Sequence, residues 1–516
     1  MRHRVAPIVV FLFAATSGFA HDDGVIVGKV TFPTSCDPKV QQTFETAVAM
    51  LHSYWFPQAE KTFNAVLKDD PQCAIAYWGL AVTNLDNSLA FPPTAKQVAQ
   101  ATEALGKARA IGAKTERERD WIGAIGAYYK DVDTVPMDDR LVAYAKALER
   151  MTVKYPDDLE VWAFYALMLQ SSAPKSDRTY ANQRKSAEIL ERLVAKAPDH
   201  PGAAHYLIHA YDFPPLAQQG IPVAGKYAKI APAAPHARHM PSHIYSMVGM
   251  WEESIVSNRA ALDARADYFH AMDFMAYAYL QLGQEAKARA MIEEMREVSA
   301  RMGPNSPTAI ASIPARYALE RGDWKGAAAL PVTQLKAAQA DSLTRFARGI
   351  GMARSGDLAG ARAEIEALKE LKASLDKSSK YWAARTEEQM YAVSAWIAKA
   401  EGDVPTAEKL MKAAADGEDA SVKHVSMENR LYPLREMLAD LLLEDGKPSE
   451  ALRAYEVSMK ETPNRYRGLY GAAMAAHAAG DNAAARKYYD ALVALSKNAD
   501  GARPELARAK QVIALR

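Results

Sequence analysis

Histidine side chains gather in one stretch of the chain. Of the twelve histidines in 516 residues, five lie between residues 203 and 247. They are His205, His209, His236, His239 and His243. Imidazole binds transition metals through a neutral ring nitrogen, and it also serves as a hydrogen-bonding group in ligand sites and buried polar networks. The stretch therefore predicts a local site, whose chemistry depends on how the chain folds around these rings.

The first two histidines have the spacing of a metal-chelating pair. In the segment "HYLIHAYD", His205 and His209 share one face if the segment is helical. Two imidazoles one helical turn apart can chelate a metal when a third ligand comes from elsewhere in the fold. The sequence has no HExxH motif. The spacing therefore indicates a site without indicating a reaction.

The next three histidines fall on either side of a proline. In a continuous helix, His236, His239 and His243 would lie within an arc of about 60° on one face. Pro241 interrupts this pattern, because proline lacks a backbone donor and disfavours helical geometry at Met240. A helix that begins at Pro241 would leave His236 and His239 in the approach to it. In either case we expect the three rings to lie near one another.

A glycine followed five residues later by an alanine recurs through the second half of the chain. The glycines are Gly283, Gly322, Gly356, Gly402, Gly446 and Gly480. The alanines are Ala288, Ala327, Ala361, Ala407, Ala451 and Ala485. Two helices and two turns fit within one such interval, and small residues let neighbouring helices approach closely. The pattern predicts a series of stacked helical hairpins.

This pattern resembles the tetratricopeptide repeat family. Prolines that close the repeat add to the match, and they are Pro71, Pro156, Pro198, Pro232 and Pro463. The segments "LHSYWFPQAEKTF" and "HARHMPSHIYSMVGMWEES" resemble a secreted bacterial subgroup of that family without an assigned activity. The resemblance implies an all-α fold, a right-handed α-solenoid of about twelve hairpins whose first helices line a concave groove.

The resemblance also implies which residues line that groove. In this family, places 2, 5 and 9 of a repeat commonly face the groove and hold ligand. Hairpins that begin at Pro235 and near Phe269 put six side chains at such places. These candidate ligand-binding residues are His236, His239, His243, His270, Asp273 and Tyr277.

Three interpretations of the histidines stay open at this stage. A buried imidazole without a partner costs about 1 to 3 kcal/mol, so the rings could form a structural network with carbonyls that nearby prolines leave free. They could line a groove that binds a peptide or a small ligand. They could also hold a metal, and imidazoles with an oxygen from Asp212 or Asp273 suit zinc or copper. An enzyme would need an open coordination position for water or substrate.

The chain has only two cysteines, Cys36 and Cys73. In an oxidising compartment such a local pair most simply forms a disulfide. Closing this loop would contribute about 3 to 4 kcal/mol by constraining the unfolded chain. A thiolate metal site is the alternative, but neither cysteine has another cysteine or a histidine nearby at ligand spacing.

The first twenty residues have the features of a secretory signal peptide. Arg2 and Arg4 precede an apolar run, residues 5–15, that is too short to span a bilayer, and the small residues Gly18 and Ala20 mark a cleavage site. No later stretch reaches the roughly 18 apolar residues of a membrane span. We therefore expect a periplasmic or secreted protein.

The charges are balanced, with 63 basic and 62 acidic residues and a net charge of +1. Such a chain lacks the lasting attraction for phosphates that nucleic-acid binding needs. We expect a signal peptide (1–20), an extended arm (21–39), a repeat array (40–499) and a capping helix (500–516). The expected function is an exported scaffold that binds a protein segment or peptide. The alternative is a periplasmic zinc- or copper-binding protein or a metal-dependent enzyme.

Overall fold

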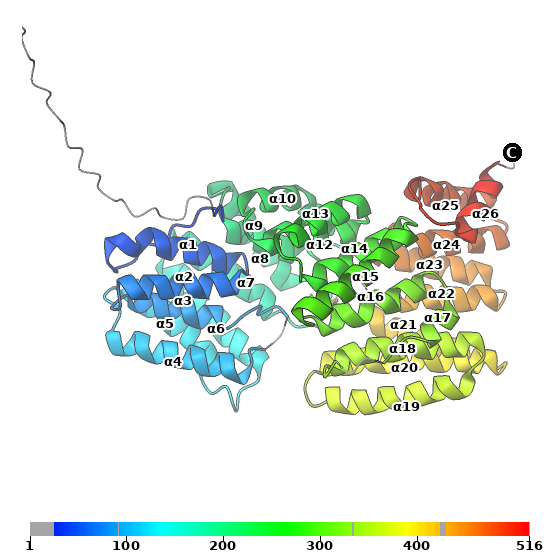
Figure 1. Cartoon of the computed structure of the whole chain (residues 1–516), viewed down its shortest axis with the longest axis horizontal. Helices are drawn as coiled ribbons and strands as arrows, with labels where there is room; N and C mark the ends of the chain where they lie inside the picture. Colours follow the sequence, from blue (N-terminus) through cyan, green and yellow to red (C-terminus); the bar gives the residue numbers. More distant parts are fainter. Residues whose placement is uncertain (1–24, 91, 333–334, 424–429, 515–516) are drawn as a thin grey trace, which may run out of the picture.

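The computed structural model describes residues 25–90, 92–332, 335–423 and 430–514. Regular structure in these ranges consists of one 3-10 helix, Pro38–Val40, and the α-helices α1 to α26, with no β-strand (Figure 1). The predicted signal peptide, residues 1–20, lies outside the described residues. The expected all-α solenoid is confirmed.

The helices follow one another closely along the chain. The first fourteen are α1 (Gln41–His52), α2 (Phe56–Asp69), α3 (Ala74–Thr83), α4 (Ala95–Ile111), α5 (Glu116–Tyr129), α6 (Met137–Lys154), α7 (Leu159–Ser171), α8 (Ala181–Lys196), α9 (Pro201–Tyr211), α10 (Ala217–Ile230), α11 (Pro235–His239), α12 (Pro241–Val248), α13 (Trp251–Ala264) and α14 (Phe269–Gln281). The others are α15 (Glu285–Met302), α16 (Pro307–Glu320), α17 (Trp324–Ala328), α18 (Ala338–Ser355), α19 (Leu358–Leu375), α20 (Lys380–Ala400), α21 (Val404–Asp419), α22 (Leu434–Glu444), α23 (Pro448–Glu461), α24 (Tyr466–Ala478), α25 (Asn482–Leu495) and α26 (Pro504–Ala514). Successive helices pack as hairpins.

The glycine turns set the hairpin register as predicted. All six turn glycines have positive φ, from 64° at Gly322 to 91° at Gly356, a conformation that side chains with a Cβ rarely adopt. The alanines five residues later are buried against the preceding helix, and Ala288 and Ala407 have no exposed surface. The small side chains thus allow the close helix packing that the sequence predicts.

The N-terminal arm is extended and packs onto the array. From residue 25 to residue 34 it has no helix, and Val27, Val30 and Phe32 are buried whereas Ile26 is exposed. The Lys29 amide donates to the Asp199 carbonyl at 2.9 Å. Cys36 and Cys73 form the predicted disulfide, which ties the arm to the start of α3. Both sulfurs are thereby used, so the alternative of a thiolate metal site does not apply.

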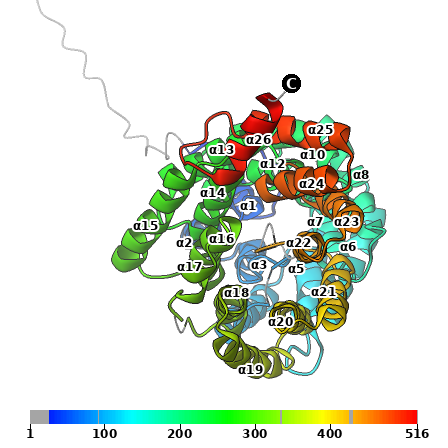
Figure 2. The same ribbon diagram turned by 90° about the vertical axis from the view of Figure 1, so that its right-hand side faces the viewer.

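Distant parts of the array meet, and the helices wind around a common axis when the molecule is viewed end-on (Figure 2). The segment between α21 and α22 contacts the N-terminal half, where Val422 is buried in the same core as the first helices. The Lys423 ammonium lies 2.7 Å from Asp212 Oδ1. On the other side, Trp251 Nε1 donates to the Asn464 carbonyl at 2.8 Å. These contacts fix the C-terminal repeats against the middle of the chain.

The last described helix, α26, packs Leu506 and Ala509 onto α25. It runs from Pro504 to Ala514. No helix among the described residues is long and apolar enough to cross a membrane.

Candidate metal centre

Six histidines from four helices come together in the middle of the array. They belong to two groups of three, and within each group the candidate ligand atoms lie within 4.8 Å of one another. The first group, here the first triad, comprises His205, His209 and His236. The second triad comprises His239, His243 and His270. All five histidines of the sequence stretch take part, together with His270 of the next repeat.

Proline residues start three of the four helices that carry the rings, namely α9, α11 and α12. The His200 side chain caps α9, and proline follows it at the first helical position, where no amide donor is needed. The predicted break at Pro241 is present, since α11 ends at His239 and α12 begins at Pro241. Met240 between them nevertheless keeps helical angles, with φ −52° and ψ −35°. His239 and His243 therefore remain one turn apart and face each other.

The hydrogen bonds of the second triad fix the protons of two of its rings. The Asn258 amide nitrogen donates to the Ser254 carbonyl at 2.8 Å, which fixes the orientation of that amide. Asn258 Oδ1 is then an acceptor, and His239 Nδ1 donates to it at 2.6 Å. His243 Nδ1 donates to the carboxylate oxygen of Asp212 at 2.9 Å. Both rings therefore carry a proton on Nδ1, and the low pKa of His239 leaves a lone pair on its Nε2.

The Nε2 atoms of these two rings face each other. Those of His239 and His243 are 3.0 Å apart, a distance at which a proton or another cation must lie between them. A proton on His239 itself is disfavoured, because burial and the neighbouring rings of His270 and His243 hold the pKa of His239 well below its usual range. A metal ion fits, since two nitrogen ligands of tetrahedral zinc lie about 3.3 Å apart for bonds of about 2.0–2.1 Å.

The first triad has a similar arrangement. His205 Nδ1 donates to the His52 carbonyl at 2.6 Å, which leaves a lone pair on His205 Nε2. That atom is 3.0 Å from His236 Nε2, and His236 Nδ1 lies 2.8 Å from the Tyr268 hydroxyl. The third member, His209, is buried, and its Nε2 atom has no hydrogen-bond partner among the described residues. In both rings an oxygen thus contacts Nδ1, while the two Nε2 atoms point toward each other. Metal-binding histidines are commonly oriented in this way, by a hydrogen bond to the ring nitrogen that does not bind the ion.

Burial favours the neutral, metal-binding form of five of the six imidazoles, those of His205, His209, His236, His239 and His270. Burial lowers the pKa of His205 to about 3. Burial, with the nearby charges of His243 and Lys423, also lowers the pKa of His270 to about 3. Burial and the neighbouring rings of His205 and His243 hold the pKa of His209 well below its usual range. No proton therefore has to be removed from these rings before an ion binds near neutral pH.

The two triads are neighbours. The ring centroids of His209 and His243 are 5.9 Å apart, and those of His236 and His239 are 6.0 Å apart. Each triad supplies three nitrogen ligands, which is the number that catalytic zinc sites commonly take from the protein. The six rings therefore fit two ions side by side, each with a coordination position left for another ligand.

A third group of titratable side chains, here the carboxylate network, comprises His52, Glu160 and His200. It differs from the triads in the partners of its ring nitrogens. His52 Nε2 donates to one oxygen of Glu160 at 2.7 Å, and its Nδ1 accepts from the Tyr206 hydroxyl at 2.9 Å. His200 Nε2 donates to the other oxygen of Glu160 at 2.8 Å, and its Nδ1 accepts from the Ala203 amide. Every ring nitrogen in this carboxylate network has a complementary partner, so the network needs no ion.

Two predicted groove residues lie in a different environment. Asp273, on α14, is paired with Arg316 at 3.4 Å. The Tyr277 hydroxyl accepts from Arg465 at 2.6 Å. Of the three candidates on α14, the structure therefore brings only His270 to the triads. The orienting residues Asn258 and Tyr268 have no sequence signal of their own, because their role depends on which ring each one contacts.

Comparison with protein-family models agrees with the helical-repeat architecture. A family model described as tetratricopeptide repeat matches residues 56–90 and 436–502. A solved structure of MamA, MSR-1 C2, is 23% identical with a TM-score of 0.27, over 32% of this chain and 89% of that chain. The human IFIT1 dimer with m7Gppp-AAAA is 11% identical with a TM-score of 0.40, over 82% of this chain and 90% of that chain. A search of curated proteins finds no significant match.

Proposed function

We propose that this tetratricopeptide-repeat protein binds transition-metal ions through two neighbouring sites of three histidines each. The observation that carries the proposal is the convergence of three ring nitrogens in each triad, within 4.8 Å of one another. A metal ion placed among them would bind all three nitrogens at once, whereas a proton on His239 is disfavoured by burial. Ligation by imidazole alone suits zinc and copper.

The chain's own residues would hold and orient the ligands. Asp212, Asn258 and the His52 carbonyl fix Nδ1 as the protonated atom of His243, His239 and His205. Burial of the rings excludes bulk water from the ligand atoms and strengthens their electrostatic interactions. A bound zinc or copper ion would supply Lewis acidity at its open position, and copper would also supply one-electron chemistry.

The burial of the rings argues against recognition of a peptide by these histidines. His205 and His239 have no exposed surface and His243 has 1%, so an extended segment lying in a groove could not contact them. The repeat fold remains a scaffold, and we assign it the task of bringing together helices that carry the metal ligands. The predicted signal peptide would place this centre in the periplasm or outside the cell.

Metal analysis of the untagged protein tests the proposal. The metal-free protein is loaded with zinc or copper, dialysed and measured by elemental analysis. We expect about two ions per chain, one for each three-histidine site. Combined replacement of His236 and His239 by alanine removes one ligand from each triad and should abolish retention of the metal.

The matched control is His477→Ala, which replaces an exposed histidine on α24 and should leave the metal content unchanged. Protein that stays free of metal after loading would contradict the proposal. So would equal metal content in the double variant and the wild type.

A further inference from the structure

A pocket opens beside the first triad. Its wall includes His209, whose Nε2 atom has no partner, and Asp212, the residue that orients His243. The pocket therefore touches the first triad directly and the second triad through its orienting carboxylate. Any small molecule that reaches the open position of an ion in the first triad would do so from this side.

Two glutamines in the same wall point to an occupant with a hydrogen-bond donor. Gln170 and Gln183 are 4% and 6% exposed, and the Oε1 atom of each has no partner among the described residues. The orientation of Gln170 is fixed, because its Nε2 donates to the Tyr206 carbonyl at 3.0 Å. Its Oε1 is therefore a true acceptor. A buried acceptor left unpaired is costly, and a ligand with an O–H group would relieve that cost.

The remaining walls are largely apolar and come from both halves of the chain. Leu89 and Phe213 lie on the N-terminal side, whereas Tyr381 and Val422 belong to the C-terminal half. Ala173 also lines the pocket and is buried. These side chains fit the body of a small apolar or aromatic molecule. Lys175 and Lys423 also line the pocket; burial lowers the pKa of Lys175, and Lys423 contacts Asp212.

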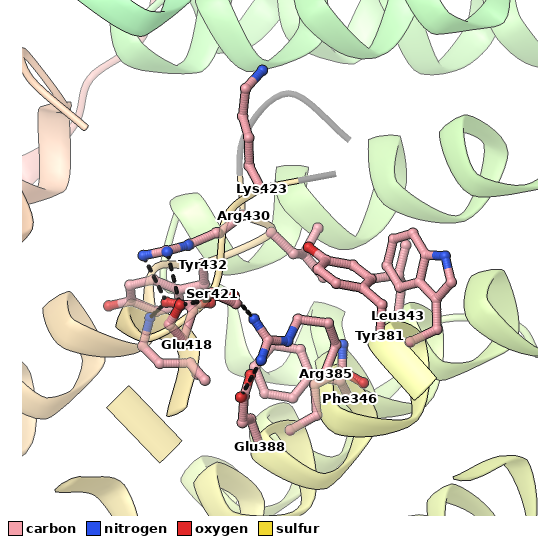
Figure 3. A pocket seen from close by; sticks show the side chains of 14 residues that line it. Leu343, Phe346, Tyr381, Arg385, Glu388, Glu418, Ser421, Lys423, Arg430 and Tyr432 are labelled. Carbon is pink, nitrogen blue, oxygen red and sulfur yellow. Dashed lines mark hydrogen bonds and ion pairs between the residues drawn. The ribbon is translucent and has the colours of Figure 1, made fainter. Parts of the chain in front are cut away.

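The neighbouring pocket in Figure 3 has a more charged wall, although it shares Tyr381 and Lys423. In that pocket Arg385 is paired with Glu388, and Arg430 lies 3.4 Å from Glu418. Lys423 extends away from these groups in the picture, and its ammonium contacts Asp212 at the C-terminal end of α9. The neighbouring pocket also has a buried amide oxygen without a partner, Gln389 Oε1, but its described lining contains no histidine, whereas the unpaired acceptors of the other pocket lie in the same wall as His209.

We infer that the pocket beside His209 binds a small hydroxyl compound of about the size of phenol. Its oxygen would take the open position of the ion held by His205, His209 and His236. Its O–H group would donate to Gln170 Oε1, and its apolar body would lie against Leu89 and the other apolar side chains of the wall. The inference rests on the proposed metal function, since it assigns a ligand to one of the two ions.

Cobalt(II)-loaded protein and phenol as the probe test this assignment. The visible absorption of cobalt reports its coordination, so phenol should change the spectrum of the wild type in a saturable way. Gln170→Leu should weaken phenol binding about tenfold, as expected for loss of a hydrogen bond in a buried site. Ala173→Trp fills the pocket and should abolish the spectral change, while the spectrum before addition of phenol stays that of the wild type.

Gln389→Leu is the matched control, because Gln389 lines the neighbouring pocket and its replacement should leave phenol binding unchanged. Cobalt that binds with a spectrum insensitive to saturating phenol would overturn the inference and leave the proposed metal function intact. Failure of cobalt, zinc and copper to bind would overturn both. Because Gln170→Leu nearly conserves volume, it keeps the test decisive even if Ala173→Trp fails to fold.

Discussion

The carboxylate network of His52, Glu160 and His200 and the two histidine triads are built from the same residue type at similar burial, yet they differ in how their nitrogens are satisfied. In the network, each ring nitrogen meets a group of complementary character, an acceptor opposite a donor. In each triad, three ring nitrogens converge within 4.8 Å of one another instead. The comparison shows that a cluster of histidines becomes a candidate metal site when its ring nitrogens point at a common centre.

The largest expected effect is a loss of stability without a loss of metal when the carboxylate network is changed. Glu160→Gln removes the charge that two histidines share, and breaking a buried pair of this kind should lower the free energy of unfolding by about 3–5 kcal/mol. The metal content after loading should stay that of the wild type, because no triad ligand changes. Chemical denaturation and elemental analysis measure the two quantities. The exposed Glu103→Gln variant should change neither, and loss of metal from Glu160→Gln would show that the network belongs to the metal site.

A smaller effect is expected at the residues that orient the triad rings. Asn258→Ala removes the acceptor of His239 Nδ1, and loss of such a partner typically weakens metal binding by about 10- to 100-fold. Competition with a chelator measures the affinity. The exposed Asn64→Ala variant is the control and should bind metal as the wild type does. An unchanged affinity in Asn258→Ala would mean that His239 does not ligate the ion.

The smallest effect concerns the dependence of stability on pH. Burial alone would raise the pKa of Glu160, but His200 and His52 outweigh it and hold that pKa well below its usual value of 4.5. A depressed carboxyl pKa gives stability that is present above 4.5 and is lost as the pH falls toward the folded-state pKa.

Acid denaturation measures this dependence. We predict that the wild type loses up to about 1.4 kcal/mol per pH unit from this group below pH 4.5. Glu160→Gln should lack that part of the slope. An equal slope in the two proteins would show that Glu160 carries no shifted pKa.

The fold and the neighbourhood of the histidines follow from local signals in the sequence. The glycine register predicts where hairpins turn, because a positive φ is needed there regardless of the rest of the fold. The spacing of His205 and His209 predicts a shared helical face, and the structure places both in the first triad. The repeat register brings His270 beside His243 because adjacent first helices lie side by side. These features depend on contacts within one repeat or between neighbours.

The remaining features depend on contacts between distant repeats, for which the sequence has no periodic signal. Lys423 reaches Asp212 across the array, and Tyr206 meets His52 154 residues away. The repeat register predicts that Asp273 and Tyr277 line a groove. In the structure, arginines from other repeats pair with them instead, and the sequence has no signal for these contacts. The sequence also does not show which histidines share a triad, because that depends on how the rings are oriented in the folded protein.

The most direct test of the two-metal centre is anomalous diffraction from crystals of the zinc-loaded protein at the zinc absorption edge. We predict two peaks, one within about 2.0–2.1 Å of ligand nitrogens in each triad, and none at the carboxylate network of Glu160. The absence of a peak at both triads, or a peak at Glu160 instead, would contradict the assignment.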